Sequence, residues 1–351
     1  MVRTNMDYVG LFRHIGTNAA VENVVLSGGS ITGRDYVGGI AGRSDGVLLS
    51  CGVDGLNILG RTYVGGIAGY IRGEIKRARV ETTVVGTNYV GGIAGLSEYG
   101  LVSRSYATGE VRGNQSVGGL VGYSYAATNA NSYAVTTVRS LLGDGFDAKT
   151  GGLVGDFYAG RITNCYAAGS LMAQGYNAGG LVGYRQSGIV TNSFTPQTPE
   201  GAGTALTQAQ MMERAVFEGA GWDFTEVWAI DDGASYPVLQ DNEQVPPPSA
   251  PAEREIGTLA DLDKIGREAD YPLSGSYRLT ADLDASETAG WNEGEGFAPI
   301  GSRSLRFSGV FNGQGHVISN LTVVRTNMDY VGLFRHIGTN AAVENVVLSG
   351  G

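Results

Sequence analysis

The chain has 351 residues, of which 57 are glycine and 9 are proline, and its formal net charge is −10. The low proline content excludes collagen, and a 42% hydrophobic content with only 17% charged residues excludes a disordered linker protein. The acidic balance disfavours nucleic-acid and anionic-membrane partners, and no apolar run is long enough for a membrane span. We therefore expect a packed chain with many tight turns.

A short glycine-centred repeat fills residues 1–199. Its first glycines recur every 26 to 33 residues, at Gly10, Gly38, Gly65, Gly91, Gly118, Gly151 and Gly179. Short β-type runs and polar turns follow each of them, with no helical pattern. Roughly three short strands per ~27 residues suit one coil of a parallel β-helix better than a four-stranded propeller blade. The sequence thus predicts an all-β fold, a parallel β-helix (β-solenoid) of about seven coils of ~27 residues with small helix-containing cap segments.

Two columns of equivalent residues follow from this alignment. The apolar column that should fill the core is Ile40, Ile67, Ile93, Leu120, Leu153 and Leu181. The size-restricted column is Val24, Cys51, Ala78, Ser105, Ser132, Cys165 and Ser193. The two cysteines would lie four coils apart, roughly 19 Å, whereas a disulfide needs Cα atoms within about 7 Å. We predict two free thiols.

One aromatic column is the candidate ligand-binding site. Tyr106, Tyr133, Tyr166 and Phe194 occupy one position in four successive coils. Facing outward, these rings would form a platform for sugar rings, and facing inward they would be core. A bend at Asn164 or Asn192 would reverse the parity of the strand, so both interpretations stay open. Tyr36, Tyr63 and Tyr89 form a similar ladder at the head of the glycine strand.

The composition changes after the coils. Residues 200–240 are predicted to be a C-terminal cap, in which Thr207 and Gln210 form a capping box. A Pro-rich linker follows at 241–253. In the last segment, we expect a short helix over 258–265 and strand–turn–strand patterns at 274–286 and 308–323.

The end of the chain repeats its beginning. Residues 324–351 are identical to residues 2–29, at an offset of 322. The simplest interpretation is one period of a longer tandem array plus an overlap, and a duplication introduced by engineering is the alternative. We therefore interpret 254–351 as the N-terminal cap and first coil of the next tandem module.

The ordered set of motifs resembles a known family. The YVGGIAG and GGLVG segments with their NCY and RSY runs look like GLUG-motif repeats. The stretch YRLTADLD…FAPIG…FSGVFNGQGHVISNL is similar to the one that precedes such repeats, and ALTQAQM…WDF…VWAI…SYPVL is similar to the one that closes them. The resemblance implies a large bacterial surface or secreted adhesin-like protein, located at the cell surface or outside the cell. The resemblance implies no particular ligand and no catalytic residues.

Catalytic chemistry has little support in the sequence. There is no HExxH motif, both thiols fall in the small-residue column, and GGIAG lacks the βαβ context of a dinucleotide fingerprint. Asp231 with Asp232 and Asp282 with Asp284 are better explained as turn residues, because no carboxylate recurs at one coil position. Asp144 and Asp147 are the least unfavourable metal candidates. We expect no enzyme activity, no catalytic or metal-binding residues and no cofactor.

The expected function is that of a structural and adhesive repeat module, a stiff spacer that displays a surface. A carbohydrate-binding β-helix is the first alternative and a polysaccharide-cleaving β-helix enzyme is the second. The expected partners are host or matrix surfaces, including glycans, and neighbouring repeats of the same protein. The open coil edge at residues 1–29 is a template for strand pairing, so head-to-tail self-association is also expected.

Overall fold

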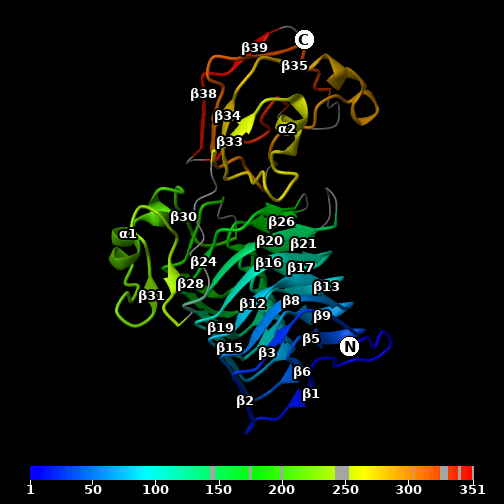
Figure 1. The fold of residues 1–351 in the computed structure, drawn as a ribbon, viewed down its shortest axis with the longest axis vertical. Helices are drawn as coiled ribbons and strands as arrows, with labels where there is room; N and C mark the ends of the chain where they lie inside the picture. The colour runs from blue at the N-terminus through cyan, green and yellow to red at the C-terminus, as the bar shows by residue number, and fades with distance from the viewer. Residues whose placement is uncertain are drawn as a thin grey trace. The chain divides into compact units, whose positions relative to one another are not determined.

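The computed structural model describes residues 1–142, 147–173, 176–197, 201–241, 253–302, 304–324, 331–338 and 341–349. The chain divides into two compact units, which we name the coil unit (Met1–Pro248) and the C-terminal unit (Ser249–Gly351). Figure 1 shows both units with their helices and strands labelled. Each unit is described by itself.

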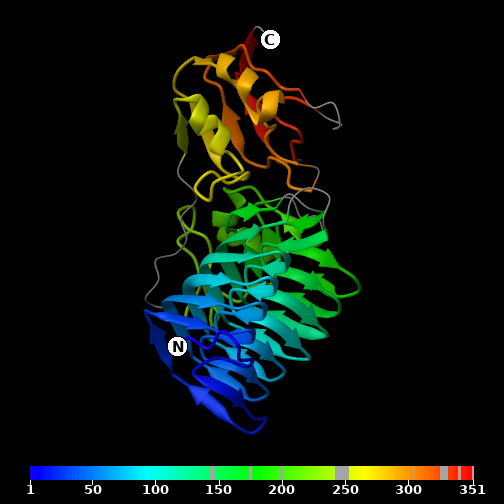
Figure 2. The same cartoon turned by 90° about the vertical axis from the view of Figure 1, so that its right-hand side faces the viewer.

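The coil unit is a stack of parallel coils (Figure 2), and coils 2 to 7 each contribute strands to four sheets, whereas the first coil contributes to three. Sheet 1 contains β1 (Phe12–Ile15), β6 (Ala41–Ser44), β10 (Ala68–Ile71), β14 (Ala94–Glu98), β18 (Val121–Tyr125), β22 (Val154–Phe157) and β27 (Val182–Arg185). Sheet 2 contains β2 (Ala20–Glu22), β7 (Val47–Leu49), β11 (Glu74–Lys76), β15 (Leu101–Ser103), β19 (Ala127–Ala130), β23 (Gly160–Thr163) and β28 (Ile189–Thr191). Each of these sheets has seven strands, so the coil unit has seven coils, which we number 1 to 7 in chain order. The C-terminal unit adds further parallel turns, so the chain contains more turns than the about seven predicted.

The other two sheets complete each coil. Sheet 3 contains β3 (Val25–Ser27), β4 (Ser30–Thr32), β8 (Gly52–Leu59), β12 (Arg79–Val85), β16 (Tyr106–Gly113), β20 (Tyr133–Ser140), β24 (Tyr166–Ala167), β25 (Leu171–Met172), β29 (Phe194–Thr195) and β30 (Thr204–Ala205). Sheet 4 contains β5 (Asp35–Gly38), β9 (Thr62–Gly65), β13 (Asn88–Gly91), β17 (Gln115–Gly118), β21 (Asp147–Gly151) and β26 (Tyr176–Gly179). The expectation of about three strands per coil was too low, because the glycine segment bends and forms one strand on each side of the bend.

Glycine occupies this bend because successive backbones touch there. In coil 3, a Cβ on Gly66 would lie 2.1 Å from the carbonyl oxygen of Gly92 in coil 4. That same oxygen accepts a hydrogen bond from the Gly66 amide at 2.9 Å. The close approach therefore belongs to the ladder that joins the coils, and any larger residue would have to push them apart.

The core contains the two predicted columns. All six residues of the apolar column have 0% exposure. Both cysteines are buried and free, as predicted. The serines of the small-residue column accept hydrogen bonds from the coil before them: Ser105 Oγ from the Ala78 amide at 3.0 Å, and Ser132 Oγ from the Ser105 amide at 3.1 Å. A larger side chain in this column would break these contacts.

Residues 201–241 leave the regular coil pattern. They contain the 3-10 turn η1 (Gln210–Met212), the helix α1 (Arg214–Gly219) and the antiparallel pair β31 (Trp228–Ala229) and β32 (Val238–Leu239). The predicted capping box is present, since the Thr207 amide donates to the Gln210 side chain at 2.9 Å and the Gln210 amide donates back to Thr207 Oγ1 at 3.2 Å. It starts only a 3-10 turn rather than a continuous helix.

The C-terminal unit holds its own short parallel stack. The helix α2 (Leu259–Lys264) begins with the capping box of Thr258 and Asp261 and buries Leu259 and Leu262. One sheet contains β33 (Arg254–Ile256), β34 (Ser276–Leu279), β36 (Val310–Asn312) and β38 (Ala342–Glu344), and a second contains β35 (Leu283–Asp284), β37 (Val317–Ser319) and β39 (Val347–Ser349). The 3-10 turns η2 (Ser286–Gly290) and η3 (Asn292–Gly294) lie between β35 and β36 in the chain. The strand–turn–strand patterns thus form no hairpins, because each strand pairs in parallel with its equivalent one turn later.

Candidate functional site

The aromatic column predicted from the sequence is buried. Tyr106, Tyr133, Tyr166 and Phe194 are 2%, 1%, 0% and 6% exposed. Tyr133 stacks on Tyr106 and on Tyr166, with ring centroids 5.0 Å apart in both pairs. The next residue in β20, Ala134, points into the core. Its Cβ lies next to Gly119, where a Cβ added to the glycine would be only 2.9 Å away. Since side chains alternate along a strand, the tyrosines face outward from the coils.

The chain covers this outward face with its own residues 201–241. Trp228 lies 6.2 Å from both Tyr133 and Tyr166, between ring centroids, and the Tyr166 hydroxyl donates to the carbonyl oxygen of Pro237 at 2.7 Å. Figure 1 shows this segment, with α1 and β31, beside β24 and β28. Burial raises the pKa of Tyr106 to about 12. The column is therefore neither solenoid core nor a sugar platform, and in this structure no ligand can reach it.

A second row of side chains lies on the outer face of sheet 1, where its members range from buried (Tyr70 and Asp156) to exposed (His14). One residue of each coil is in register with the next there, and six of them directly follow a GGxxG segment. In coil order the row is His14, Arg43, Tyr70, Leu96, Tyr123, Asp156 and Tyr184. The signal was present in the sequence, since a tyrosine follows every second GGxxG segment (Tyr70, Tyr123 and Tyr184), but the columns derived from the repeat did not include that position.

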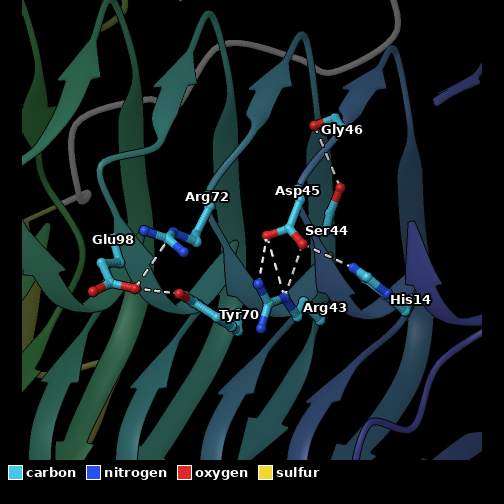
Figure 3. A network of polar contacts seen from close by, with 8 residues as sticks. All are labelled: His14, Arg43, Ser44, Asp45, Gly46, Tyr70, Arg72 and Glu98. Carbon is cyan, nitrogen blue, oxygen red and sulfur yellow. Dashed lines mark hydrogen bonds and ion pairs between the residues drawn. The ribbon is translucent and has the colours of Figure 1, made fainter. Parts of the chain in front are cut away.

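The first part of this row is a network around one carboxylate (Figure 3). Asp45 Oδ2 lies 2.8 Å from His14 Nε2, and Asp45 Oδ1 accepts from Arg43 Nη2 at 3.0 Å. Burial alone raises the pKa of Asp45, but hydrogen bonds from Arg43 and His14 outweigh it and hold the pKa below its usual value. The network therefore keeps a charged carboxylate and a guanidinium paired at the surface.

The second part of the row joins coils 3 and 4. The Tyr70 hydroxyl donates to Glu98 Oε2, and Arg72 Nε lies 3.6 Å from the same oxygen. The Arg43 guanidinium lies 4.8 Å from the centroid of the Tyr70 ring, and the Arg72 guanidinium lies 5.7 Å from that of Tyr99. Burial, followed by the hydrogen bond to Glu98, raises the pKa of Tyr70 well above its usual value. This tyrosine is a neutral hydrogen-bond donor at physiological pH.

Two grooves border these residues. The first, which we name the tyrosine groove, has a volume of about 370 Å³ and is lined by Tyr36, Tyr70, Leu96, Glu98, Tyr123 and Tyr125. The second, the glycine groove, has a volume of about 480 Å³. It runs over Gly46, Gly73 and Gly100 at one corner of successive coils, and Arg72 and Tyr99 also line it. The Arg72–Glu98 ion pair joins the two grooves, since Arg72 lines one and Glu98 lines the other.

The tyrosine ladder noted in the sequence stands beside the tyrosine groove. Tyr8, Tyr36, Tyr63 and Tyr89 stack with successive centroid distances of 4.5, 4.7 and 4.8 Å. All four residues have φ between 55° and 59°, a left-handed conformation that costs energy for a non-glycine residue. Stacking covers the faces of these rings, so the ladder presents ring edges and hydroxyl groups to the solvent.

The carboxylates on this face are held in ion pairs. Asp45, Glu98 and Asp156 belong to coils 2, 4 and 6, and each has a basic partner, which for Asp156 is Lys149 at 2.8 Å. Burial raises the pKa of Asp156 despite that lysine.

The remaining acidic candidates have local roles where the structure describes them. Asp282 accepts from the Val317 amide at 3.0 Å, Asp232 accepts from the Arg214 amide at 2.7 Å, and Asp147 accepts from Asn177 at 2.8 Å. Asp144 lies outside the described residues. Within the described ranges, no group of three or more His, Cys, Asp or Glu side chains is placed to hold a metal ion.

Comparisons with known proteins concern parts of the chain. Residues 86–112, which form one coil, match the family model described as the GLUG motif. A stretch of 178 residues is 34% identical to halomucin of Haloquadratum walsbyi, covering 49% of this chain and 2% of halomucin. A stretch of 75 residues is 44% identical to a protein named as a Gly-rich membrane protein in Evansella cellulosilytica, covering 18% of this chain and 9% of that protein. The chain thus spans a small fraction of both relatives.

A solved structure is also similar. It is named as an immunoglobulin A1 protease from Bacteroides ovatus, and it matches 63% of this chain and 69% of its own with 19% identity and a TM-score of 0.41. In the part of the chain that the structure describes, no helix combines the length and the apolar character needed to cross a membrane.

Proposed function

We propose that this chain is a non-enzymatic module of a cell-surface or extracellular protein, and that the coil unit is a stiff support that displays its outer face to external partners. The observation that carries this proposal is the ladder of seven coils in sheets 1 and 2, over a core whose central residues are fully buried. Every coil is hydrogen-bonded to the next through parallel strands, so bending the stack would break several ladders at once.

The comparisons support a surface role. The GLUG motif and the β-solenoid fit a surface repeat module, and the two relatives carry names that refer to a mucin-like and a membrane protein. From these names we infer a location at the cell surface or outside the cell. The adhesive role that the sequence analysis expects is part of this proposal, with matrix components and glycans as partners.

The non-enzymatic part of the proposal is tested by looking for products. The full chain is incubated with neutral polysaccharides, with polygalacturonate and with matrix proteins, and new reducing ends, unsaturated sugars and new peptide termini are measured. We expect none above the level of a heat-denatured sample, because each carboxylate of the outer face is paired with a cation. Sustained product release that survives repurification would overturn this part.

The support and display part is tested in two ways. Amide hydrogens in coils 3 to 6 should exchange only through unfolding of the whole unit, since they lie in ladders paired on both sides. Beads coated with the full chain should attach to immobilised matrix or glycan surfaces more than beads coated with an unrelated acidic protein. Rapid exchange in these coils, or equal attachment of the two kinds of bead, would contradict the proposal.

We further propose that copies of the chain associate head to tail. The duplicated segment supports this, because its two copies pair through opposite edges. In the first copy, Val21 is in register with Leu48 of the following coil, and in the second copy Val343 is in register with Phe311 of the preceding turn. The strands β2, β3, β38 and β39 each end a sheet, so the edge that one copy uses is open in the other.

Light scattering over a range of concentrations tests this association. The edge strands carry exposed apolar side chains, with Val25 49% and Val347 44% exposed. Changing both valines to lysine should abolish the increase of molecular mass with concentration, because pairing of the two edges would bury the charged lysine side chains. Leu59→Lys, on a strand paired on both sides, is the control and should leave the association intact. A constant monomer mass for the unchanged chain would refute the proposal.

A further inference from the structure

We infer that the tyrosine groove and the glycine groove together bind an uncharged oligosaccharide that lies along the stack of coils. This inference rests on the proposed function, since it names the ligand class of the displayed face. It differs from the aromatic platform of sheet 3, because it uses the side chains that line the two grooves rather than the column that residues 201–241 bury.

Aromatic surface is the first reason. The tyrosine groove is lined by four tyrosines, and among them Tyr125 is only partly buried. Tyr99, at the rim between the two grooves, is 57% exposed and meets Tyr125 edge to face, with centroids 5.5 Å apart. A tyrosine combines an apolar ring with a polar tip. These rings therefore match a sugar, which offers C–H faces and hydroxyl edges together.

Fixed polar groups are the second reason. The Arg72 guanidinium and the Glu98 carboxylate stand between the grooves, where each is held by its partner and by a tyrosine. Their side chains remain 47% and 31% exposed. Groups that are oriented before the ligand arrives lose little freedom on binding, and both donors and acceptors are present for sugar hydroxyls.

Charge balance is the third reason, and it selects an uncharged ligand. The ionic side chains at the grooves form matched pairs, Arg43 with Asp45, Arg72 with Glu98, and Lys76 with Glu74. Their charges cancel in pairs, and the whole chain is acidic. A nucleic acid or an anionic polysaccharide would need a basic surface, which this face does not offer.

Periodicity is the fourth reason. The tyrosine groove is lined by residues of coils 2 to 5 and the glycine groove by residues of coils 1 to 5. A linear polymer along the stack meets an equivalent position at every coil, roughly every 4.8 Å. We therefore expect affinity to increase with the number of sugar residues until the ligand spans about four coils.

The experiment uses the full chain and linear hexasaccharides of β-1,4-glucan, β-1,3-glucan and mannan, with hexagalacturonate as the charged comparator. Binding is measured by calorimetry. We expect at least one uncharged hexasaccharide to bind, and the matching disaccharide and hexagalacturonate to bind more weakly. Tyr125→Ala should weaken binding about three- to tenfold, because it removes one aromatic contact.

Two further variants locate the site. Tyr125→Phe keeps the ring and should retain most of the affinity. Tyr184→Ala changes the same residue type on the same sheet in coil 7, outside both grooves, and should bind as the unchanged chain does. All variants are checked by thermal unfolding, and because Tyr125→Ala also removes ring contacts with Tyr99, Tyr123 and Tyr158, binding is measured at a temperature at which every variant is folded.

The inference is overturned if no uncharged hexasaccharide binds, if hexagalacturonate binds best, or if Tyr125→Ala and Tyr184→Ala weaken binding equally. Its failure is distinguishable from that of the proposed function. Absent sugar binding with intact bead attachment and no product release rejects the grooves alone. Release of cleaved sugars rejects the non-enzymatic module, whatever the grooves bind.

Discussion

The close contact between coils at the glycine bend gives a quantitative prediction. Gly66→Ala would place a Cβ 2.1 Å from the Gly92 carbonyl oxygen and 2.7 Å from a methyl carbon of Val80. Ordinary contact begins at 3.4 Å, so the oxygen would have to move by about 1.3 Å. That oxygen also accepts the Gly66 amide at 2.9 Å, and the displacement would break this hydrogen bond.

The magnitude follows from three opposing effects. Overpacking a tight site costs about 1 to 3 kcal/mol, and here the neighbour is backbone, which favours the upper value. The lost hydrogen bond adds about 1 kcal/mol to this cost. Alanine also lowers the conformational entropy of the unfolded chain, which stabilises the folded state by about 0.4 to 1 kcal/mol. We expect a net loss of about 3 kcal/mol. For a unit of this size that corresponds to a melting temperature lower by about 6 to 12 °C.

The matched control is Gly219→Ala in the same unit. Gly219 ends α1, and a Cβ there would meet nothing within 4 Å, so the same substitution should raise stability by about 0.4 to 1 kcal/mol. Guanidinium unfolding of the full chain measures both variants, with the transition of the coil unit separated from that of the C-terminal unit. If Gly66→Ala proves neutral or stabilising, the argument that the ladder requires glycine is wrong.

Three further predictions concern other parts of the coil unit. Cys51 and Cys165 should not react with a thiol reagent in the folded chain and should both react in denaturant. The reason is that burial raises the pKa of both thiols, that of Cys165 to about 12. Reaction of Cys165 in the folded chain would contradict its placement. Tyr166→Phe should lower the free energy of unfolding, measured with a chemical denaturant, by about 1 kcal/mol, because the Pro237 carbonyl loses its hydrogen-bond donor. An unchanged midpoint would show that residues 201–241 do not hold this ring. The folded pKa of Asp45 lies below its unfolded value, so its contribution to stability is present above about pH 4 and is lost as the pH falls through the folded pKa. Asp45→Asn should therefore lose less stability than the unchanged chain between about pH 5 and pH 2, and parallel pH profiles would refute this.

Much of the coil architecture was predictable because it repeats. A column such as Ile40, Ile67 and Ile93 appears in the sequence at a fixed interval, and stacking places equivalent residues directly above one another. The capping boxes at Thr207 and Thr258 were predictable for a different reason, since each depends on residues three positions apart. The outer row after the GGxxG segments was equally regular, and evaluating that position would have revealed it.

The sequence did not determine whether the aromatic column would be exposed or covered. Asn164 has a φ of 51°, so the strand does bend beside Cys165 and Tyr166, and the two neighbours face opposite sides of the sheet. Both are nevertheless fully buried, Cys165 in the core and Tyr166 beneath Trp228. Periodicity reports only which residues are equivalent from coil to coil, and it carries no information about a later segment that folds back over a face.

By itself, the sequence determined the all-β class, the parallel stack, the length of each coil, the inward columns and the free thiols, because these follow from contacts between residues about one period apart. Only the tertiary structure decided which outward face stays accessible. Residues 201–241 bury the tyrosines of sheet 3, while the grooves beside sheet 1 keep exposed side chains such as Tyr99. The physical reason is that covering a face depends on contacts between residues far apart in the chain and outside the repeat, such as Tyr166 with Pro237.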